Sequence, residues 1–229
     1  MVGGVRRSAM ISLSNLSDIR MRHAKSGQWW ETAPHRALAN NSVSYTEKPD
    51  IETFMREWTA LVESKSGERG IFNREASKAQ AAKYGRRDPD WQFGTNPCSE
   101  IILRPYQFCN LTEVVVRATD TIKDLERKVK LATILGTIQS SYTKFPYLRK
   151  VWQRNTEEER LLGVSLTGIM DNPIMTTVNN KLAGVLDDLR NVAVATNLEY
   201  AELLDIPQSA AITCVKPSGT VSQLVDSAS

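Results

Sequence analysis

Residues 111–142, "LTEVVVRATDTIKDLERKVKLATILGTIQSSY", decide the fold class because a strand pattern and a long helix pattern follow one another directly. The first part, 111–118, is rich in β-branched residues, which are typical of strands. The second part, 120–142, repeats its apolar residues every three or four positions, which predicts an amphipathic helix. Those apolar residues are Ile122, Leu125, Val129, Ala132, Leu135 and Ile138. The stretch therefore predicts one strand–helix unit.

Similar patterns lie on both sides of this unit. Strands are predicted at 8–14, 41–46, 161–169 and 210–215, and helices at 50–64 and 181–204. Asp50 follows a proline and is the expected N-cap of the first of these helices. One helical stripe of that helix carries Ile51, Phe54, Met55, Trp58, Leu61 and Val62. Strands that alternate with helices of this length predict an α/β fold with a mostly parallel sheet.

The two ends of the chain bear on its completeness. The chain opens on a glycine pair close to the first predicted strand, and it closes on "GTVSQLVDSAS", near the last one. A parallel sheet cut at these points would expose unpaired strand edges, which isolated proteins avoid. We therefore expect an interior piece of a larger domain.

Composition excludes several classes of protein. The 229 residues are 41% hydrophobic, enough for a core, and the 29 basic and 26 acidic residues give a net charge of only +3. That balance is too even to predict direct binding of nucleic acid or of a membrane. No apolar run reaches the roughly 20 residues of a membrane span, and the N-terminus lacks a signal-peptide pattern. Three scattered cysteines form no secreted disulfide framework, so we expect a cytoplasmic protein.

The candidate catalytic side chains lie in "GTNPCSEIILRPYQFCNLTEVV" (94–115). Pro97 pushes the preceding Asn96 toward an extended backbone. If the extension continues, Asn96, Cys98 and Glu100 point to the same side. A nucleophilic cysteine would need a histidine, but the only two, His23 and His35, lie more than 60 positions upstream. A neighbouring carboxylate favours a neutral thiol, which suits hydrogen-atom chemistry.

A second cysteine follows at a short distance. Cys109 lies eleven residues after Cys98, beyond the turn-forming "RPYQ", so the chain can return it to the same pocket. The spacing fits neither a CxxC redox motif nor a zinc site. The alternative is that each thiol is a small buried hydrophobe. For Cys214, inside the predicted strand 210–215, we favour that alternative and assign it to the core.

The segment "KPSGT" (216–220) predicts an anion site. Gly219 allows close approach of the backbone, while Ser218 and Thr220 add hydroxyl groups beside backbone N–H groups. The segment follows a predicted strand, and sites of α/β proteins gather at the carboxyl ends of strands. The alternative is a plain Pro-Ser-Gly turn.

These motifs resemble one enzyme family. "NPCSEI" (96–101) resembles the NPCxE signature of the large subunit of ribonucleotide reductases. "FCNL" (108–111) follows at the short spacing of the adenosylcobalamin-dependent branch, class II. Four further segments are similar to segments of the family in the expected order. They are "GGVRRSAMISLS" (3–14), "ANNSV" (39–43), "LLGVSLTGIMD" (161–171) and "VKPSGTVSQL" (215–224).

The resemblance implies a fold and its parts. It implies part of the ten-stranded α/β barrel of these reductases, incomplete at both ends. Residues 1–229 would be the central part of a single catalytic barrel domain, with a radical-cysteine loop at about 94–110 and a phosphate loop at about 215–222. The redox partner of Cys109, the C-terminal dithiol and the allosteric region would lie outside this chain. The chain alone would then be inactive.

The resemblance also implies roles for single residues. Cys98 would carry the thiyl radical that takes the 3′ hydrogen of the ribose, and Glu100 would act as general base on the 3′-hydroxyl group. Asn96 would hold the ribose by a hydrogen bond, and Cys109 would be one of two reducing thiols that become a disulfide. Substrate binding is expected at Pro217, Ser218, Gly219, Thr220, Val221, Asn40 and Asn41.

The implied activity is reduction of ribonucleoside di- or triphosphates to deoxyribonucleotides for DNA synthesis. The implied cofactor is adenosylcobalamin, and the implied partners are the remaining segments of the reductase and an external dithiol such as thioredoxin. Two alternatives remain. One is the same barrel with a diiron partner or a glycyl radical as radical source, although the short cysteine spacing argues against the diiron branch. The other is a non-catalytic assembly or regulatory part, against which the intact Asn96, Cys98, Glu100 and Cys109 argue.

Overall fold

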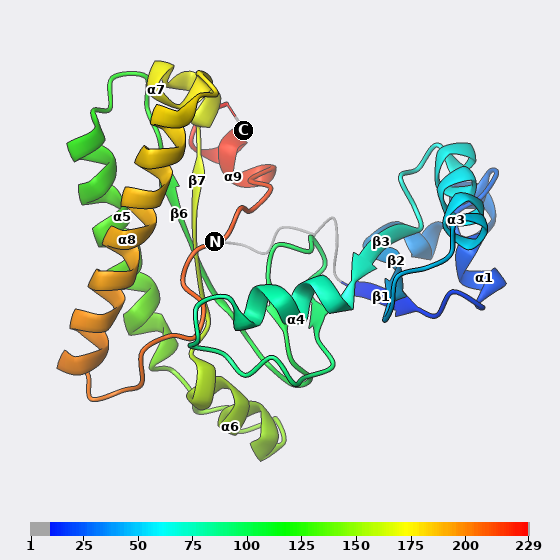
Figure 1. Ribbon diagram of the computed structural model, residues 1–229, viewed down its shortest axis with the longest axis horizontal. Helices are drawn as coiled ribbons and strands as arrows, with labels where there is room; N and C mark the ends of the chain where they lie inside the picture. Colours follow the sequence, from blue (N-terminus) through cyan, green and yellow to red (C-terminus); the bar gives the residue numbers. More distant parts are fainter. Residues whose placement is uncertain (1–9, 229) are drawn as a thin grey trace. The chain divides into compact units, whose positions relative to one another are not determined.

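The chain folds into two compact units. The computed structural model describes residues 10–228; the first unit ends at Pro105 and the second begins at Tyr106. Figure 1 shows the elements of both units coloured along the sequence. Each unit mixes helices with parallel strand pairs, so the predicted α/β class is confirmed. Each unit is described by itself below.

The first unit is built on a three-stranded parallel sheet. Its strands are β1 (Met10–Ser14), β2 (Ala39–Tyr45) and β3 (Gly70–Asn73), in that order across the sheet. The predicted strands at 8–14 and 41–46 are therefore confirmed, although residues 8 and 9 lie outside the described range. Sequence patterns did not predict β3, whose four residues are too few to show alternation.

Helices connect these strands, and a further helix follows the last of them. They are α1 (Ile19–Arg22), α2 (Trp29–Thr32), the 3-10 helix η1 (Pro34–Leu38), α3 (Ile51–Ser64) and α4 (Arg74–Ala82). Asp50 is the N-cap of α3, as predicted, and its Oδ1 accepts a hydrogen bond of 2.8 Å from the Thr53 backbone N–H. Such a cap stabilises a helix by about 1 kcal/mol.

The apolar stripe of α3 does not form its buried face. Ile51 is 83% exposed and Val62 58% exposed, and Met55 and Trp58 are also exposed. The most buried residue of α3 is Glu57, at 2% exposure. The expectation of a single packed stripe over this helix is therefore wrong. A charged residue determines the orientation because it meets two arginines there.

Glu57 is the centre of a buried ionic cluster in the first unit. Arg69 donates from Nε to Glu57 Oε2 at 3.0 Å and from Nη2 to Oε1 at 2.8 Å, and Arg22 donates from Nε to Oε1 at 2.6 Å. Arg69 also donates from Nη1 to Ser14 Oγ and to the Asn15 carbonyl oxygen, both at 2.9 Å. The cluster thus ties α3 and α1 to the end of β1.

The second unit is built on a parallel strand pair. β6 (Asn110–Val115) pairs with β7 (Leu162–Thr167) over their whole length, from Asn110 opposite Leu162 to Val115 opposite Thr167. The predicted strand at 210–215 runs beside β7 but forms only one isolated bridge, between Val164 and Thr213. Its hydrogen bonds include one of 2.9 Å from the Val164 N–H to the Ile212 carbonyl oxygen. The strand prediction there is confirmed only in part.

The helices of the second unit include the two long ones that the sequence predicted. The set is α5 (Ile122–Ser140), α6 (Lys150–Glu159), the 3-10 helix η2 (Ile169–Asp171), α7 (Pro173–Thr176), α8 (Asn180–Leu203) and α9 (Thr220–Leu224). Thr121 and Asp124 form a capping box at the start of α5. Within residues 10–228, no helix has both the length and the apolar character that crossing a membrane requires.

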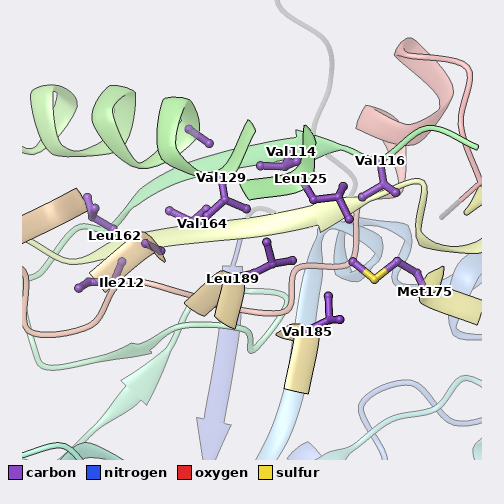
Figure 2. Close-up of a cluster of buried hydrophobic side chains, with 12 residues drawn as sticks. Val114, Val116, Leu125, Val129, Leu162, Val164, Met175, Val185, Leu189 and Ile212 are labelled. Atoms are coloured by element: carbon purple, nitrogen blue, oxygen red, sulfur yellow. The ribbon is translucent and has the colours of Figure 1, made fainter. Parts of the chain in front are cut away.

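The core of the second unit lies between the strand pair and α5 and α8, which pack against each other (Figures 1 and 2). Its buried side chains are Val114, Val116, Leu125, Val129, Ala132, Leu162, Val164, Met175, Val185, Leu189, Ala193 and Ile212. From the predicted α5 stripe, Leu135 and Ile138 remain outside, at 64% and 38% exposure. Because strand side chains alternate, residues 111, 113 and 115 of β6 face away from these helices.

Gly168, after β7, gives a prediction for folding stability. Its φ is +77°, and an added Cβ atom would clash with the Val116 carbonyl oxygen. Gly168→Ala should therefore lower the free energy of unfolding by at least about 2 kcal/mol. Gly184→Ala is the matched control in α8, where an added Cβ meets no atom within 4 Å and the helix should gain up to about 1 kcal/mol. Equal urea unfolding midpoints for the two variants would contradict the prediction.

Candidate active site

The NPCSE motif forms the tip of a β-hairpin. The hairpin pairs β4 (Gly94–Thr95) with β5 (Ile102–Leu103) in antiparallel fashion. Ser99 has φ +64° and donates its backbone N–H to the Asn96 carbonyl oxygen at 2.9 Å, so residues 96–99 form a tight turn. Pro97 fits the second position of such a turn because its ring fixes φ near the required value. The expectation of an extended backbone over 96–100 is therefore wrong.

The Asn96 side chain helps to hold this tip. Its Oδ1 accepts a hydrogen bond of 3.1 Å from the backbone N–H of the buried Ile101, and a longer one of 3.4 Å from Thr95 Oγ1. Amide side chains commonly close turns in this way. The carboxamide oxygen of Asn96 is thus engaged within the hairpin, and it holds the loop that presents Cys98.

Cys98 lies exposed at the tip and lines a cavity of about 300 Å³ within the first unit. The cavity is also lined by Asn40, Asn41 and Ser42 of β2 and by Glu68, whose Oε1 accepts a hydrogen bond of 2.8 Å from Lys25 Nζ. Asn96 and Glu100 do not line it in the described part of the chain. Glu100 is half-buried, and both of its carboxylate oxygens are shielded from solvent. The turn therefore does not place the predicted trio along one cavity wall.

The two asparagines of β2 have different surroundings. Asn40 Nδ2 donates a hydrogen bond to the Pro97 carbonyl oxygen and so joins β2 to the hairpin tip beside Cys98. Asn41 is 5% exposed and donates from Nδ2 to the Met21 carbonyl oxygen at 2.6 Å. Neighbouring side chains of a strand point to opposite faces of the sheet. The structure therefore places the Asn40 side chain near Cys98 and directs that of Asn41 toward α1.

Cys109 belongs to the second unit, whereas Cys98 belongs to the first, and each is described within its own unit. Cys109 is half-buried and directly precedes β6. Its neighbour Phe108 stacks on the Trp152 ring, with 4.7 Å between ring centroids. On the other side, the Asn110 backbone N–H donates to the Leu161 carbonyl oxygen at 2.8 Å. Both neighbours of Cys109 are thus held in place.

The predicted phosphate loop follows the segment that runs beside β7. Gly219 has φ +47°, and open space surrounds the position of its missing side chain. Pro217 and Thr220 are exposed, whereas Ser218 is only 8% exposed. The Val221 N–H donates to the Ser218 carbonyl oxygen at 2.9 Å and closes the turn. The backbone of this loop is therefore accessible at Gly219.

Two polar residues that lie near the start of this loop, Glu113 and Ser165, were not singled out from the sequence. Glu113 of β6 lies opposite Ser165 of β7 in the sheet register, and Ser165 Oγ accepts a hydrogen bond of 3.0 Å from the Lys216 backbone N–H. Burial raises the pKa of the Glu113 carboxyl group, and the positive charge of Lys216 opposes this rise only in part. The available signal was a single glutamate inside the β-branched run 111–118, which the strand pattern alone did not explain.

The chain is similar in sequence to known reductases. The adenosylcobalamin-dependent ribonucleoside-triphosphate reductase of Lacticaseibacillus paracasei is 30% identical over 97% of this chain and 32% of its own length. The enzymes of the same name from Lactobacillus gasseri and Lactobacillus leichmannii are 30% and 29% identical over the same share of this chain. The chain spans about one third of the length of these relatives. No family model matches the chain.

A solved structure supports the fold. The crystal structure of a B12-dependent (class II) ribonucleotide reductase superposes with a TM-score of 0.74 at 24% sequence identity. The match covers 95% of this chain and 33% of that one, as expected for one part of a larger barrel. The resemblance to class II ribonucleotide reductases is thus confirmed, and the chain is homologous to about one third of the adenosylcobalamin-dependent ribonucleoside-triphosphate reductases.

Proposed function

We propose that this chain is the catalytic segment of an adenosylcobalamin-dependent ribonucleotide reductase, which makes deoxyribonucleotides for DNA synthesis. The observation that supports this most is the exposed Cys98 at a hairpin tip beside a polar cavity, in a chain homologous to such enzymes. In this proposal, the two units are parts of one catalytic barrel domain that other segments of the enzyme complete. A cytoplasmic location fits this chemistry, since the thiols must stay reduced.

The proposed reaction begins at Cys98. When bound, adenosylcobalamin supplies the radical that oxidises a thiol by one electron, and the exposed Cys98 sulfur fits that requirement because a bulky group can approach it. The resulting thiyl radical takes the 3′ hydrogen atom of the ribose and later returns a hydrogen atom to the same carbon. Glu100 takes the 3′-hydroxyl proton and returns it at the end of the reaction, and the 2′-hydroxyl group leaves as water with a proton that comes from the two reducing thiols.

Two further thiols balance the reaction. Cys109 and a second thiol from another segment of the enzyme donate two electrons and two protons, and their sulfurs form a disulfide. An external dithiol such as thioredoxin then reduces this disulfide. The turn geometry adds a role for Asn96, which holds the Cys98 loop through the Ile101 N–H in addition to the ribose contact proposed for it.

The remaining site residues bind the substrate in this proposal. The backbone around Gly219 takes the phosphate groups, and Pro217, Ser218, Thr220 and Val221 frame this position. Asn40 is better placed than Asn41 to approach a substrate, because its side chain reaches the hairpin tip. The ligand class is a ribonucleoside di- or triphosphate.

The test is an assay of deoxynucleotide formation by the reductase assembled from this chain and its remaining segments. We expect activity that requires adenosylcobalamin, a ribonucleotide and a dithiol together. Activity with a diiron partner subunit in place of adenosylcobalamin would overturn the cofactor assignment. An assembled barrel that binds nucleotide but forms no product with either radical source would support the non-catalytic alternative.

A further inference from the structure

Two buried polar atoms lack hydrogen-bond partners on one sheet face of the second unit, as far as the structure describes it. This is the face that points away from α5 and α8. Glu113 Oε1 and Thr167 Oγ1 are both inaccessible to solvent and have no hydrogen-bond partner among the described residues. Thr167 is only 1% exposed. A buried polar atom without a partner costs about 1–3 kcal/mol, so such atoms indicate a site rather than a packed core.

These atoms border the proposed phosphate loop. Glu113 lies opposite Ser165, and Thr167 follows Ser165 by two positions, so the three side chains share one face. Ser165 Oγ in turn accepts the Lys216 N–H, which fixes the start of the "KPSGT" segment against this face. The charge of Lys216 acts on the Glu113 carboxylate. The Glu113 carboxylate therefore lies on the same sheet face to which the Lys216 backbone is fixed, before any phosphate arrives.

We propose that Glu113 controls the affinity of the phosphate loop for its ligand, because its carboxylate competes with the substrate's phosphate groups for the Lys216 ammonium group. This inference rests on the proposed function of residues 215–222. An anionic Glu113 repels an incoming phosphate group and also attracts the Lys216 ammonium group that would pair with the phosphate. A neutral Glu113 does neither. Phosphate affinity should therefore depend on the protonation of Glu113.

The neighbours of Glu113 allow this pH dependence to be isolated. On β6 the same face carries Leu111 and Val115, and on β7 it carries Ser165 and Thr167, none of which titrates in the working range. The adjacent segment contributes Cys214 and Lys216. Because burial raises the pKa of Glu113 above the ordinary glutamate value of about 4.3, its charge changes closer to neutrality. Affinity should fall as pH rises through this pKa.

Titration calorimetry with the chain and inorganic triphosphate tests this inference. Glu113→Gln should bind triphosphate about fivefold more tightly than the wild type at about pH 8, and the two affinities should converge as pH falls below the pKa of Glu113. Glu202→Gln is the matched control on an exposed position of α8 and should follow the wild type. Lys216→Met should lose most of the binding in either background.

The outcomes separate the two proposals. Binding that needs Lys216 but is unchanged by Glu113→Gln would overturn the role of Glu113 and leave the phosphate loop standing. Binding that ignores Lys216 would also overturn the role of Glu113, because no ammonium group would then be shared, and absence of any triphosphate binding would overturn both proposals. A carbon-13 titration of the wild type gives a second measurement, since competition requires that bound triphosphate raise the pKa of Glu113. An unchanged Glu113 titration on saturation with triphosphate would refute the competition even if the variant failed to fold.

Discussion

Replacing Cys98 with serine should abolish deoxynucleotide formation by the assembled reductase while the hairpin that carries it stays folded. Serine has nearly the same shape as cysteine, but its O–H bond is much stronger than the S–H bond. The hydroxyl group therefore cannot readily form a radical or return a hydrogen atom to the ribose carbon. When catalytic residues act as a unit, removing the one on which every later step depends lowers the rate about as much as removing all of them. We therefore expect product formation to fall by at least about 10³-fold.

The hairpin should survive this change because, within residues 10–228, none of its stabilising hydrogen bonds uses the Cys98 sulfur. The turn is closed by the Ser99 N–H and the Asn96 carbonyl oxygen, and it is held from the side by Asn96 Oδ1 and by Asn40. Cys98 itself is exposed. Loss of activity in Cys98→Ser can thus be assigned to the chemistry once the unfolding midpoint is shown to be unchanged.

Cys214→Ser is the sulfur-to-oxygen control. Cys214 lies half-buried in the segment beside β7, where its backbone N–H donates to the Val164 carbonyl oxygen at 3.1 Å. We expect this variant to keep activity within about threefold, since small surface or half-buried changes rarely cost more than 0.5–1 kcal/mol. Full activity in Cys98→Ser would remove the thiyl radical from the proposed reaction and favour the non-catalytic alternative.

The sequence predicted the long elements well because their patterns were long enough to be unambiguous. The helix at 120–142 became α5, and that at 181–204 became α8. Both pack on a strand pair that the β-branched runs had located. β3, β4 and β5 escaped prediction since they have four residues or fewer, and periodicity carries little information over so short a stretch.

Two errors had the same origin, which is that side-chain chemistry overrode periodicity. In α3, hydrophobic spacing placed Ile51 and Val62 inside, but the pairing of Glu57 with two arginines turned that charged residue inward. In "EEER" (157–160), where a run of charged residues predicts an exposed surface, Glu159 is 5% exposed and accepts a hydrogen bond from Gln107 Nε2. None of these partners could be inferred from local sequence, because Arg69, Arg22 and Gln107 lie 12, 35 and 52 positions away from the glutamates that they meet.

The candidate site shows a third limit of sequence patterns. The residue types were informative, since Cys98 lies exposed beside a cavity and the loop around Gly219 is open. The alternation argument nevertheless failed at Pro97, because proline is compatible with both extended chain and the second position of a turn. Glu113 gave the opposite case, in which an apparently ordinary strand residue gained significance only from its neighbours Ser165 and Lys216.

Glu57→Gln should destabilise the first unit strongly. Arg69 is 2% exposed and donates two hydrogen bonds to the Glu57 carboxylate, so the neutral amide would leave a buried guanidinium group without its counter-charge. Breaking a buried ion pair from one side costs about 3–5 kcal/mol. The loss should appear as a lower urea unfolding midpoint of the first unit. Glu52→Gln is the matched control on the same helix, because Glu52 pairs with the exposed Arg56 and should change stability by less than about 0.5 kcal/mol.

The pH dependence of this stabilisation has a definite sign. Burial works to raise the pKa of Glu57, but the hydrogen bonds and charges of Arg69 and Arg22 outweigh it, so the pKa of Glu57 is lowered in the folded state. Between the folded and the unfolded pKa, the unfolded chain binds more protons, and stability therefore rises with pH. The contribution of Glu57 is complete above the ordinary glutamate value of about 4.3 and is lost as pH falls through the folded pKa. Unfolding curves of wild type and Glu57→Gln should thus differ most near neutrality and converge in acid, and a difference that stayed constant with pH would show that packing, not charge, holds α3 in place.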